Sequence, residues 1–105
     1  MSQLDPSKAW LGNVPRGIDK GHVKRLLGQH GVADILDVGV FDPTPAAMEA
    51  ARSRGGQLPD AYAFVHFPSE VARDRGIVRM NGLVCLGPKP LRCEAATLST
   101  GAWLD

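Results

Sequence analysis

The sequence predicts an α+β domain in which a four-stranded antiparallel sheet carries two helices on one of its faces. Six segments of regular hydrophobic pattern follow one another in the order strand, helix, strand, strand, helix, strand. Glycine, proline or asparagine marks most of the boundaries between them. This order lets both helices cover the same face of the sheet and leaves the other face open.

The first strand is predicted at residues 8–14, KAWLGNV, where side chains alternate in type until Pro15 and Gly17 impose a turn. Asp19 is a candidate N-cap for the helix that follows, and Gly31 ends that helix. The apolar stripe of this helix has the spacing i, i+3, i+4, i+7 and consists of Val23, Leu26, Leu27 and His30. An amphipathic helix is therefore expected between the first two strands.

The second strand is predicted at residues 33–41, ADILDVGVF, because the run is rich in β-branched residues and alternates at its end. Asp42 and Pro43 end it. The connection that follows, residues 42–60, is unusually long. Its centre is rich in Ala, Met and Glu, so we expect about one and a half helical turns there before Gly55 and Gly56. The rest of this segment is expected to be a mobile loop.

The third strand is predicted at residues 61–67, AYAFVHF, and Ser69 is a candidate cap for a second helix that runs to Met80. Gly76 lies in the middle of this helix, where glycine costs about 1 kcal/mol in propensity. Asn81-Gly82 ends the helix. The fourth strand is predicted at residues 90–96, PLRCEAA, with Leu91 and Cys93 on one face. These elements form one domain at 8–96, and residues 1–7 and 97–105, including Trp103, are expected to be flexible tails.

The composition excludes several classes of protein. Twelve Lys and Arg stand against eleven Asp and Glu, a formal charge of +1, which excludes a nucleic-acid binder driven mainly by charge. No stretch approaches the roughly eighteen apolar residues of a membrane-spanning helix, and the amino terminus lacks a signal pattern. We therefore expect an intracellular protein without membrane contact. It is expected to be nuclear or cytoplasmic, with the nucleus slightly favoured.

The titratable residues do not form a reactive constellation. Cys85 and Cys93 lack the CxxC spacing of a zinc site, so buried, reduced thiols are expected. His22, His30 and His66 have no acidic or cysteine partner at ligand spacing. Neither a metal nor any other cofactor is expected. There is also no phosphate-cradling glycine loop and no nucleophile with its base, so we expect no enzymatic activity.

Two segments resemble the paired signature boxes of the RNA recognition motif (RRM) family. Residues 60–67, DAYAFVHF, resemble the eight-residue box on the third strand, and residues 9–14, AWLGNV, resemble the six-residue box on the first. The resemblance covers residues 8–96 and implies a ferredoxin-like βαββαβ fold. Asp60 and Ala61 depart from the family pattern, which has Lys or Arg and then Gly. Asp60 is therefore expected to repel a phosphate group.

The resemblance implies a role for the sheet face, because residues two apart in a strand share a face. Trp10, Tyr62 and Phe64 match family positions that stack nucleic-acid bases. By the same alternation, the stacking surface is bordered by Lys8, Phe41, His66, Arg92 and Glu94, with Lys8 and Arg92 for phosphate and the polar groups for base edges. Arg52 and Arg54 in the long loop are further candidates for phosphate. The opposite face is expected to be core and consists of Leu11, Ala63, Val65 and Phe67, packed under Val23, Leu27, Val38 and Leu91.

The function we expect is binding of single-stranded RNA by stacking on these rings. The domain is expected to be a monomer that works beside other proteins of an RNA-processing complex. One alternative is a protein-interaction domain whose sheet or helical face binds a peptide, since the family includes such members. A small enzyme on the same architecture, such as an acyl-phosphate hydrolase, is the other alternative, and the missing catalytic groups argue against it.

Overall fold

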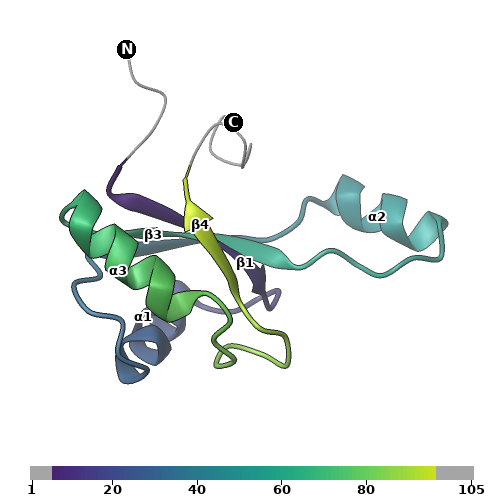
Figure 1. The fold of residues 1–105 in the computed structure, drawn as a ribbon. Coiled ribbons are helices and arrows are strands. Elements are labelled where there is room, and N and C mark those ends of the chain that lie inside the picture. The colour runs from purple at the N-terminus through teal and green to yellow at the C-terminus, as the bar shows by residue number, and fades with distance from the viewer. Residues whose placement is uncertain (1–5, 97–105) are drawn as a thin grey trace, which may run out of the picture.

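One antiparallel sheet organises the part of the chain that the computed structural model describes, residues 6–96. Its strands are β1 (Lys8–Val14), β2 (Asp37–Phe41), β3 (Ala61–His66) and β4 (Arg92–Ala95). The strand order is β2-β3-β1-β4, so β1 and β3 lie in the centre. Helices α1 (Lys20–Gln29) and α3 (Glu70–Met80) pack on one face of this sheet (Figure 1). The predicted ferredoxin-like α+β fold, with two helices on one face, is confirmed.

Both of these helices begin where the sequence indicated. The Asp19 carboxylate accepts hydrogen bonds from the backbone amides of Gly21 and His22. The Ser69 hydroxyl accepts one from the amide of Ala72 at 3.1 Å. Each cap satisfies amide groups that have no partner inside the helix, which fixes the point at which the helix starts.

The core lies between the two helices and the sheet. All eight side chains that the sequence assigned to it are buried: Leu11, Ala63, Val65, Phe67, Val23, Leu27, Val38 and Leu91. Other buried members of the same cluster are Ala9, Val14, Val32, Ala61, Met80 and Cys93. The strand residues among them alternate with residues that point to the other face, as the period of two requires. The register of the sheet therefore follows the hydrophobic pattern.

Gly76 has a packing role that its poor helix propensity conceals. A Cβ placed on this residue would lie 2.4 Å from Cζ of Phe67, which is far too close. The Phe67 ring is 1% exposed and packs directly against the backbone of α3. The missing side chain at Gly76 thus lets the helix approach the sheet closely.

The second strand is shorter than predicted. It begins at Asp37 instead of residue 33, because Asp34 adopts a left-handed backbone conformation with φ of +65°. A strand cannot continue through that conformation. The fourth strand is also shorter, Arg92–Ala95 instead of 90–96. Leu91 lies outside the strand, because its amide donates to the carbonyl of Leu83 at 2.9 Å and not to a residue of β1.

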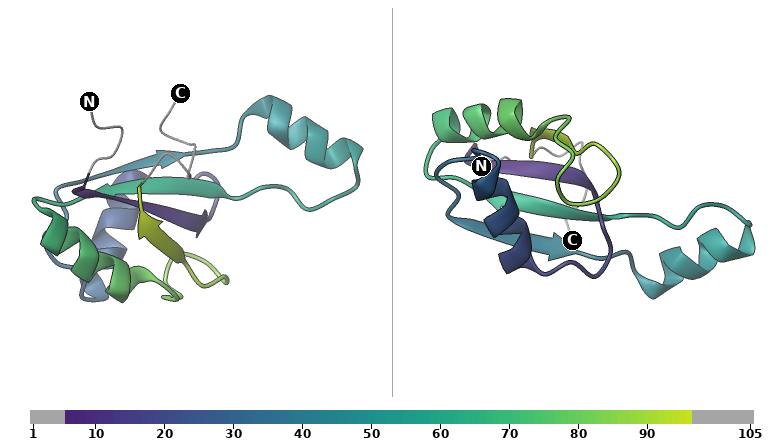
Figure 2. Two further views of the ribbon diagram at one scale, coloured as in Figure 1. Left: turned by 45° about the horizontal axis from the view of Figure 1, so that its top comes forward. Right: turned by 90° about the horizontal axis from the view of Figure 1, so that it is seen from below.

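The long connection between β2 and β3 contains a third helix, α2 (Pro45–Ser53), so the expected one and a half turns were too few. The Thr44 hydroxyl caps it by accepting from the amide of Ala47 at 3.1 Å, and Pro45 occupies its first turn. Figure 2 shows α2 beyond the end of the sheet, clear of the face that carries α1 and α3.

A bulge interrupts β1. The pairing of β1 with β3 shifts between Leu11 and Val14, and Asn13 has φ of +64°. Its side-chain amide donates to the carbonyl of Pro90 at 2.9 Å, which holds the bulge against the segment before β4. The extra residue brings Val14 back to the core face.

Of the amino-terminal segment expected to lie outside the domain, the structure describes Pro6 and Ser7. The Ser7 carbonyl accepts a hydrogen bond from the amide of Phe67 at 2.7 Å, so the chain is tied to the sheet one residue before β1. The expected flexible tail at 97–105, with Trp103, lies outside the described residues.

Candidate nucleic-acid interface

Strand pairing arranges the candidate residues in rows on the face opposite α1 and α3, called here the sheet face. Cross-strand register places Asp37, His66 and Lys8 in one row. The next row contains Gly39, Phe64, Trp10 and Glu94. Phe41 and Tyr62 pair in a third row, and Arg92 pairs with Gly12. The sheet face therefore gathers Trp10, Tyr62, Phe64, Lys8, Arg92, His66 and Phe41.

The indole of Trp10 lies flat along its own strand. A Cβ on Gly12 would approach Cη2 of Trp10 to 2.4 Å, so the ring covers the glycine that follows it on the same face. The Arg92 guanidinium lies 6.0 Å from the Trp10 ring centroid, at cation–π distance. Trp10 remains partly exposed. The result is a flat aromatic surface with a cation at its rim.

Phe41 and Tyr62 form a second flat surface. Their ring centroids are 5.3 Å apart and the ring planes differ by 18°, so the two rings stack. Phe41 is 46% exposed and is the most accessible ring of the sheet face, where Trp10 and Tyr62 are partly exposed and Phe64 is buried. Gly39 again makes room, since a Cβ there would lie 3.3 Å from Cε2 of Phe41. Phe41, expected only to border the stacking surface, therefore presents such a surface itself.

Phe64 is enclosed, which corrects the expectation that it forms an exposed platform. Only 7% of the residue is accessible. It meets Phe41 and Tyr62 edge to face, with both centroid distances 6.0 Å. The Lys8 ammonium lies 5.5 Å above its ring centroid. Neighbours in its own strand and in the adjacent strands thus surround Phe64, which packs edge to face beside the rings of Phe41 and Tyr62.

Asp60 does not carry the unpaired charge that the sequence suggested. Its carboxylate accepts a hydrogen bond from the Lys89 ammonium at 2.6 Å, and 28% of the Asp60 side chain is exposed. The two residues are 29 positions apart in sequence. Lys89 therefore largely neutralises the charge of Asp60, and we no longer expect Asp60 to repel a phosphate group.

Arg52 and Arg54 are not brought onto the sheet face. Both belong to α2 or its carboxyl end, which lies beyond the sheet (Figure 2). The Arg52 guanidinium is 3.5 Å from the Glu49 carboxylate, and both side chains are well exposed. These arginines can meet only a strand that continues past Phe41 and Tyr62.

Sequence reasoning missed two kinds of residue on this face. Asp37 lies next to His66 in the first row and is exposed. Its place followed from alternation with Phe41, a signal that was present in the sequence. Gly12 and Gly39 were missed because the need for a missing side chain appears only once the rings are placed.

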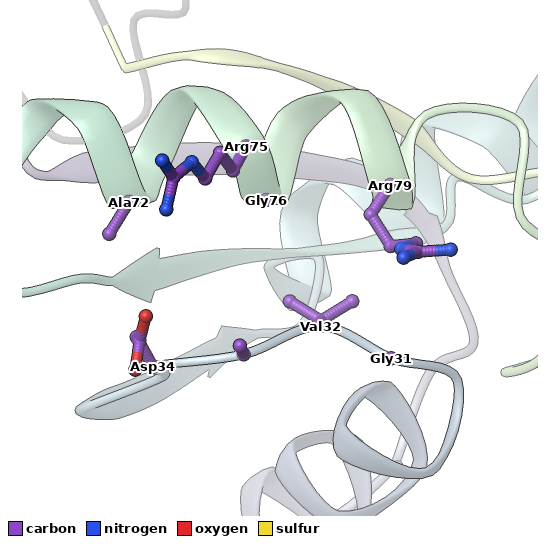
Figure 3. Close-up of a pocket in the computed structure, with 8 residues that line it drawn as sticks. Gly31, Val32, Asp34, Ala72, Arg75, Gly76 and Arg79 are labelled. Atoms are coloured by element: carbon purple, nitrogen blue, oxygen red, sulfur yellow. The ribbon is translucent and has the colours of Figure 1, made fainter.

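The helical face carries a groove of about 300 Å³ between α3 and residues 31–34 (Figure 3). Arg75 and Arg79 line it from α3, with Asp34 on the opposite wall. Among the described residues neither arginine has an ion pair. Their neighbour Arg73, in contrast, pairs with Glu70 at 3.5 Å and Asp74 at 2.6 Å.

The thiols are isolated. Burial, with a smaller contribution from the Glu94 carboxylate, raises the pKa of Cys93 to about 12, and burial also raises the pKa of Cys85. Within residues 6–96, no three His, Cys, Asp or Glu side chains lie close enough to hold a metal ion. Within the same residues, no helix is both long and apolar enough to cross a membrane.

Comparison with solved structures relates this geometry to known proteins. A structure titled "Structure of Mip6 RRM3 Domain" superposes with a TM-score of 0.64 and 12% identity, covering 91% of this chain and 100% of that one. A structure titled "Structure of RNA15 RRM" superposes with a TM-score of 0.59 and 20% sequence identity. The match covers 90% of this chain and 93% of that one. A structure titled "SXL-LETHAL PROTEIN/RNA COMPLEX" superposes with a TM-score of 0.60 and 18% sequence identity. The match covers 91% of this chain and 52% of that one. The chain has the RNA recognition motif fold.

No protein-family model and no curated protein matches the sequence. The likeness is therefore one of backbone fold, because identity with the three structures compared is at most 20%. An RRM sheet with aromatic residues on both central strands can offer flat surfaces to nucleic-acid bases.

Proposed function

We propose that this RRM domain binds single-stranded RNA by stacking bases on the sheet face. The observation that carries the proposal is the pair of flat, accessible surfaces formed by Trp10 and by Phe41 with Tyr62. A base needs a flat partner, and each stack contributes about 1 to 3 kcal/mol. One structural neighbour is titled as a protein–RNA complex, which supports the same use of this fold.

Charge has a secondary role in the proposed binding. Lys8 lies above Phe64, and Arg92 lies beside Trp10, so each cation is placed to meet the phosphate of a base stacked nearby. Duplex RNA should bind poorly, since bases paired in an A-form helix cannot be laid flat on a sheet. The domain acts by binding alone and performs no catalysis in this proposal.

The experiment is a titration of a fluorescent single-stranded RNA pool with the wild type and with Trp10→Ala. We expect the variant to bind about tenfold more weakly, because it loses one stacking surface. Trp10→Phe is the matched control and should keep most of the affinity. Thermal unfolding of each variant checks the fold. Unchanged affinity in a folded Trp10→Ala variant would contradict the proposal.

A second candidate function is peptide binding at the helical groove. Arg75 and Arg79 lie one helical turn apart and form no ion pair with an acid among residues 6–96, which favours an acidic segment as the occupant. Val78, 81% exposed, lies on the same helix and could contact an apolar residue of that segment. Selection from a displayed peptide library, repeated with Arg75→Glu and Arg79→Glu, tests this. Loss of acidic binders in that variant, with RNA binding intact, is the result expected.

A further inference from the structure

A slot of about 150 Å³ opens on the sheet face beside Phe64. Its lining is aromatic and backbone on one side and polar on the other, and consists of Phe41, Phe64, Gly39, Lys8, Asp37 and His66. In the strand register the polar row lies next to the Gly39 and Phe64 row, with Phe41 beyond. A planar ring entering the slot would rest against aromatic carbon and turn an edge towards Asp37.

The Asp37 carboxylate differs from the other acids near this face. It forms no hydrogen bond or ion pair with another described residue. Glu94, in contrast, lies 3.9 Å from Arg92, and Asp60 is bound to Lys89. An ionised carboxylate has only acceptors. Asp37 therefore lines the slot with two oxygens for which this part of the chain supplies no donor.

Among the four RNA bases, guanine alone presents two adjacent donors, N1–H and the 2-amino group, on one edge. A carboxylate can accept both at once, as it does from the forked donors of arginine. Adenine and cytosine place an acceptor nitrogen beside their amino group. Uracil places its single N–H between two carbonyl oxygens. Adenine, cytosine and uracil would each bring an acceptor atom next to the Asp37 carboxylate, which has no hydrogen to donate.

We propose that Asp37 makes this slot a guanine-selective subsite. The Asp37 carboxylate accepts from N1–H and the 2-amino group of guanine, and the base packs against Phe41. Lys8 also lines the slot, and its ammonium has donors and no acceptors, which suits O6 beside N1 on the same edge of the base. The inference rests on the proposed binding of single-stranded RNA and adds to it a base preference at one position.

The experiment uses fluorescence anisotropy with the full chain and short oligouridine strands that differ at one central base. The base is uridine, adenosine, cytidine, guanosine or inosine, which keeps N1–H and O6 and lacks the 2-amino group. We expect the guanosine strand to bind about tenfold more tightly than the uridine strand. Inosine should lose part of this gain. Asp37→Asn should remove the preference by bringing the affinities of the guanosine and uridine strands together, because the amide no longer offers two acceptors to guanine and no longer sets a carboxylate against the oxygens of uracil.

Asp34→Asn is the matched control. It removes the same charge on the helical side, and asparagine also tolerates the left-handed backbone at residue 34. This control should keep the guanosine preference. Equal binding of all five strands, or a preference that survives Asp37→Asn, would overturn the inference while RNA binding stands. Failure of every strand to bind would overturn the proposed function itself.

Discussion

Single atoms determine how the aromatic side chains lie. The absence of a Cβ at Gly12 and Gly39 allows the rings of Trp10 and Phe41 to lie down on the sheet face. On the helical side, the same absence at Gly76 admits the Phe67 ring. None of these three glycines has left-handed torsion angles, so the backbone conformation does not require glycine there. What each contact requires is the space that a side chain would fill.

Two helix glycines without left-handed torsions, Gly76 and Gly28, test whether space is what these contacts need. Gly76→Ala gains helix propensity but forces a methyl group into Phe67, so we expect a net loss of about 1 to 2 kcal/mol. Gly28→Ala in α1 meets nothing within 4 Å and should stabilise the protein by up to about 1 kcal/mol. Urea unfolding of both variants measures the difference. Similar stabilities would show that Phe67 does not depend on Gly76.

The buried thiol of Cys93 predicts a pH dependence. Its pKa is raised from 9.0 to about 12 by burial, and Glu94 adds to the shift, so the folded state holds the proton longer than the unfolded state. Its contribution to stability is complete below pH 9 and is lost as the pH rises towards 12. We expect the free energy of unfolding to fall more steeply in this range for the wild type than for Cys93→Ala. Parallel curves would contradict the assignment.

Only part of this side-chain arrangement could be predicted from the sequence. Trp10 and Tyr62 could be assigned to one face because the side chains of a strand alternate between the two faces of the sheet, and this alternation is a local property of each strand. The enclosure of Phe64 was not predictable, since it depends on residues in β1 and β2 that meet it only after the strands pair. The Asp60–Lys89 pair was hidden for the same reason, because no local pattern links residues 29 positions apart.

Elements with strong local signals were predictable, and those that depend on context were less so. Asp19 and Ser69 begin their helices as read from sequence. The start of α2 carries an equally local signal, Thr44 followed by Pro45, although only about one and a half helical turns were predicted in this segment. The late start of β2 follows from the backbone of Asp34, which composition does not reveal.

Helix α2 should affect RNA binding only for long strands. It connects the ends of β2 and β3 that carry Phe41 and Tyr62, and it extends away from the sheet (Figure 2). We expect Arg52→Gln with Arg54→Gln to leave short oligonucleotides unaffected and to weaken longer ones several-fold. Glu49→Gln, which frees Arg52 from its 3.5 Å ion pair, should act in the opposite direction. Equal weakening at every strand length would place these arginines near the sheet after all.

The whole molecule carries a formal charge of only +1, so its RNA affinity should depend weakly on salt. Lys8 and Arg92 are the cations that lie over sheet-face rings, which corresponds to about two phosphates on a short strand. The plot of log affinity against log salt should then have a slope near −1.4 for single-stranded RNA. Anisotropy titrations at several salt concentrations measure it. A slope several times steeper would assign the binding to the basic helical faces.

The two outer strands also bear on how copies of this chain meet. β2 and β4 are the edges of the sheet, and they contain five and four residues. An edge strand is a template for adding a strand from another molecule, and short, charged edges are poor templates. Pro90 precedes β4 without an amide hydrogen, and Arg92 and Glu94 alternate along it. Concentrated solutions of the protein should therefore resist strand-by-strand polymerisation into amyloid.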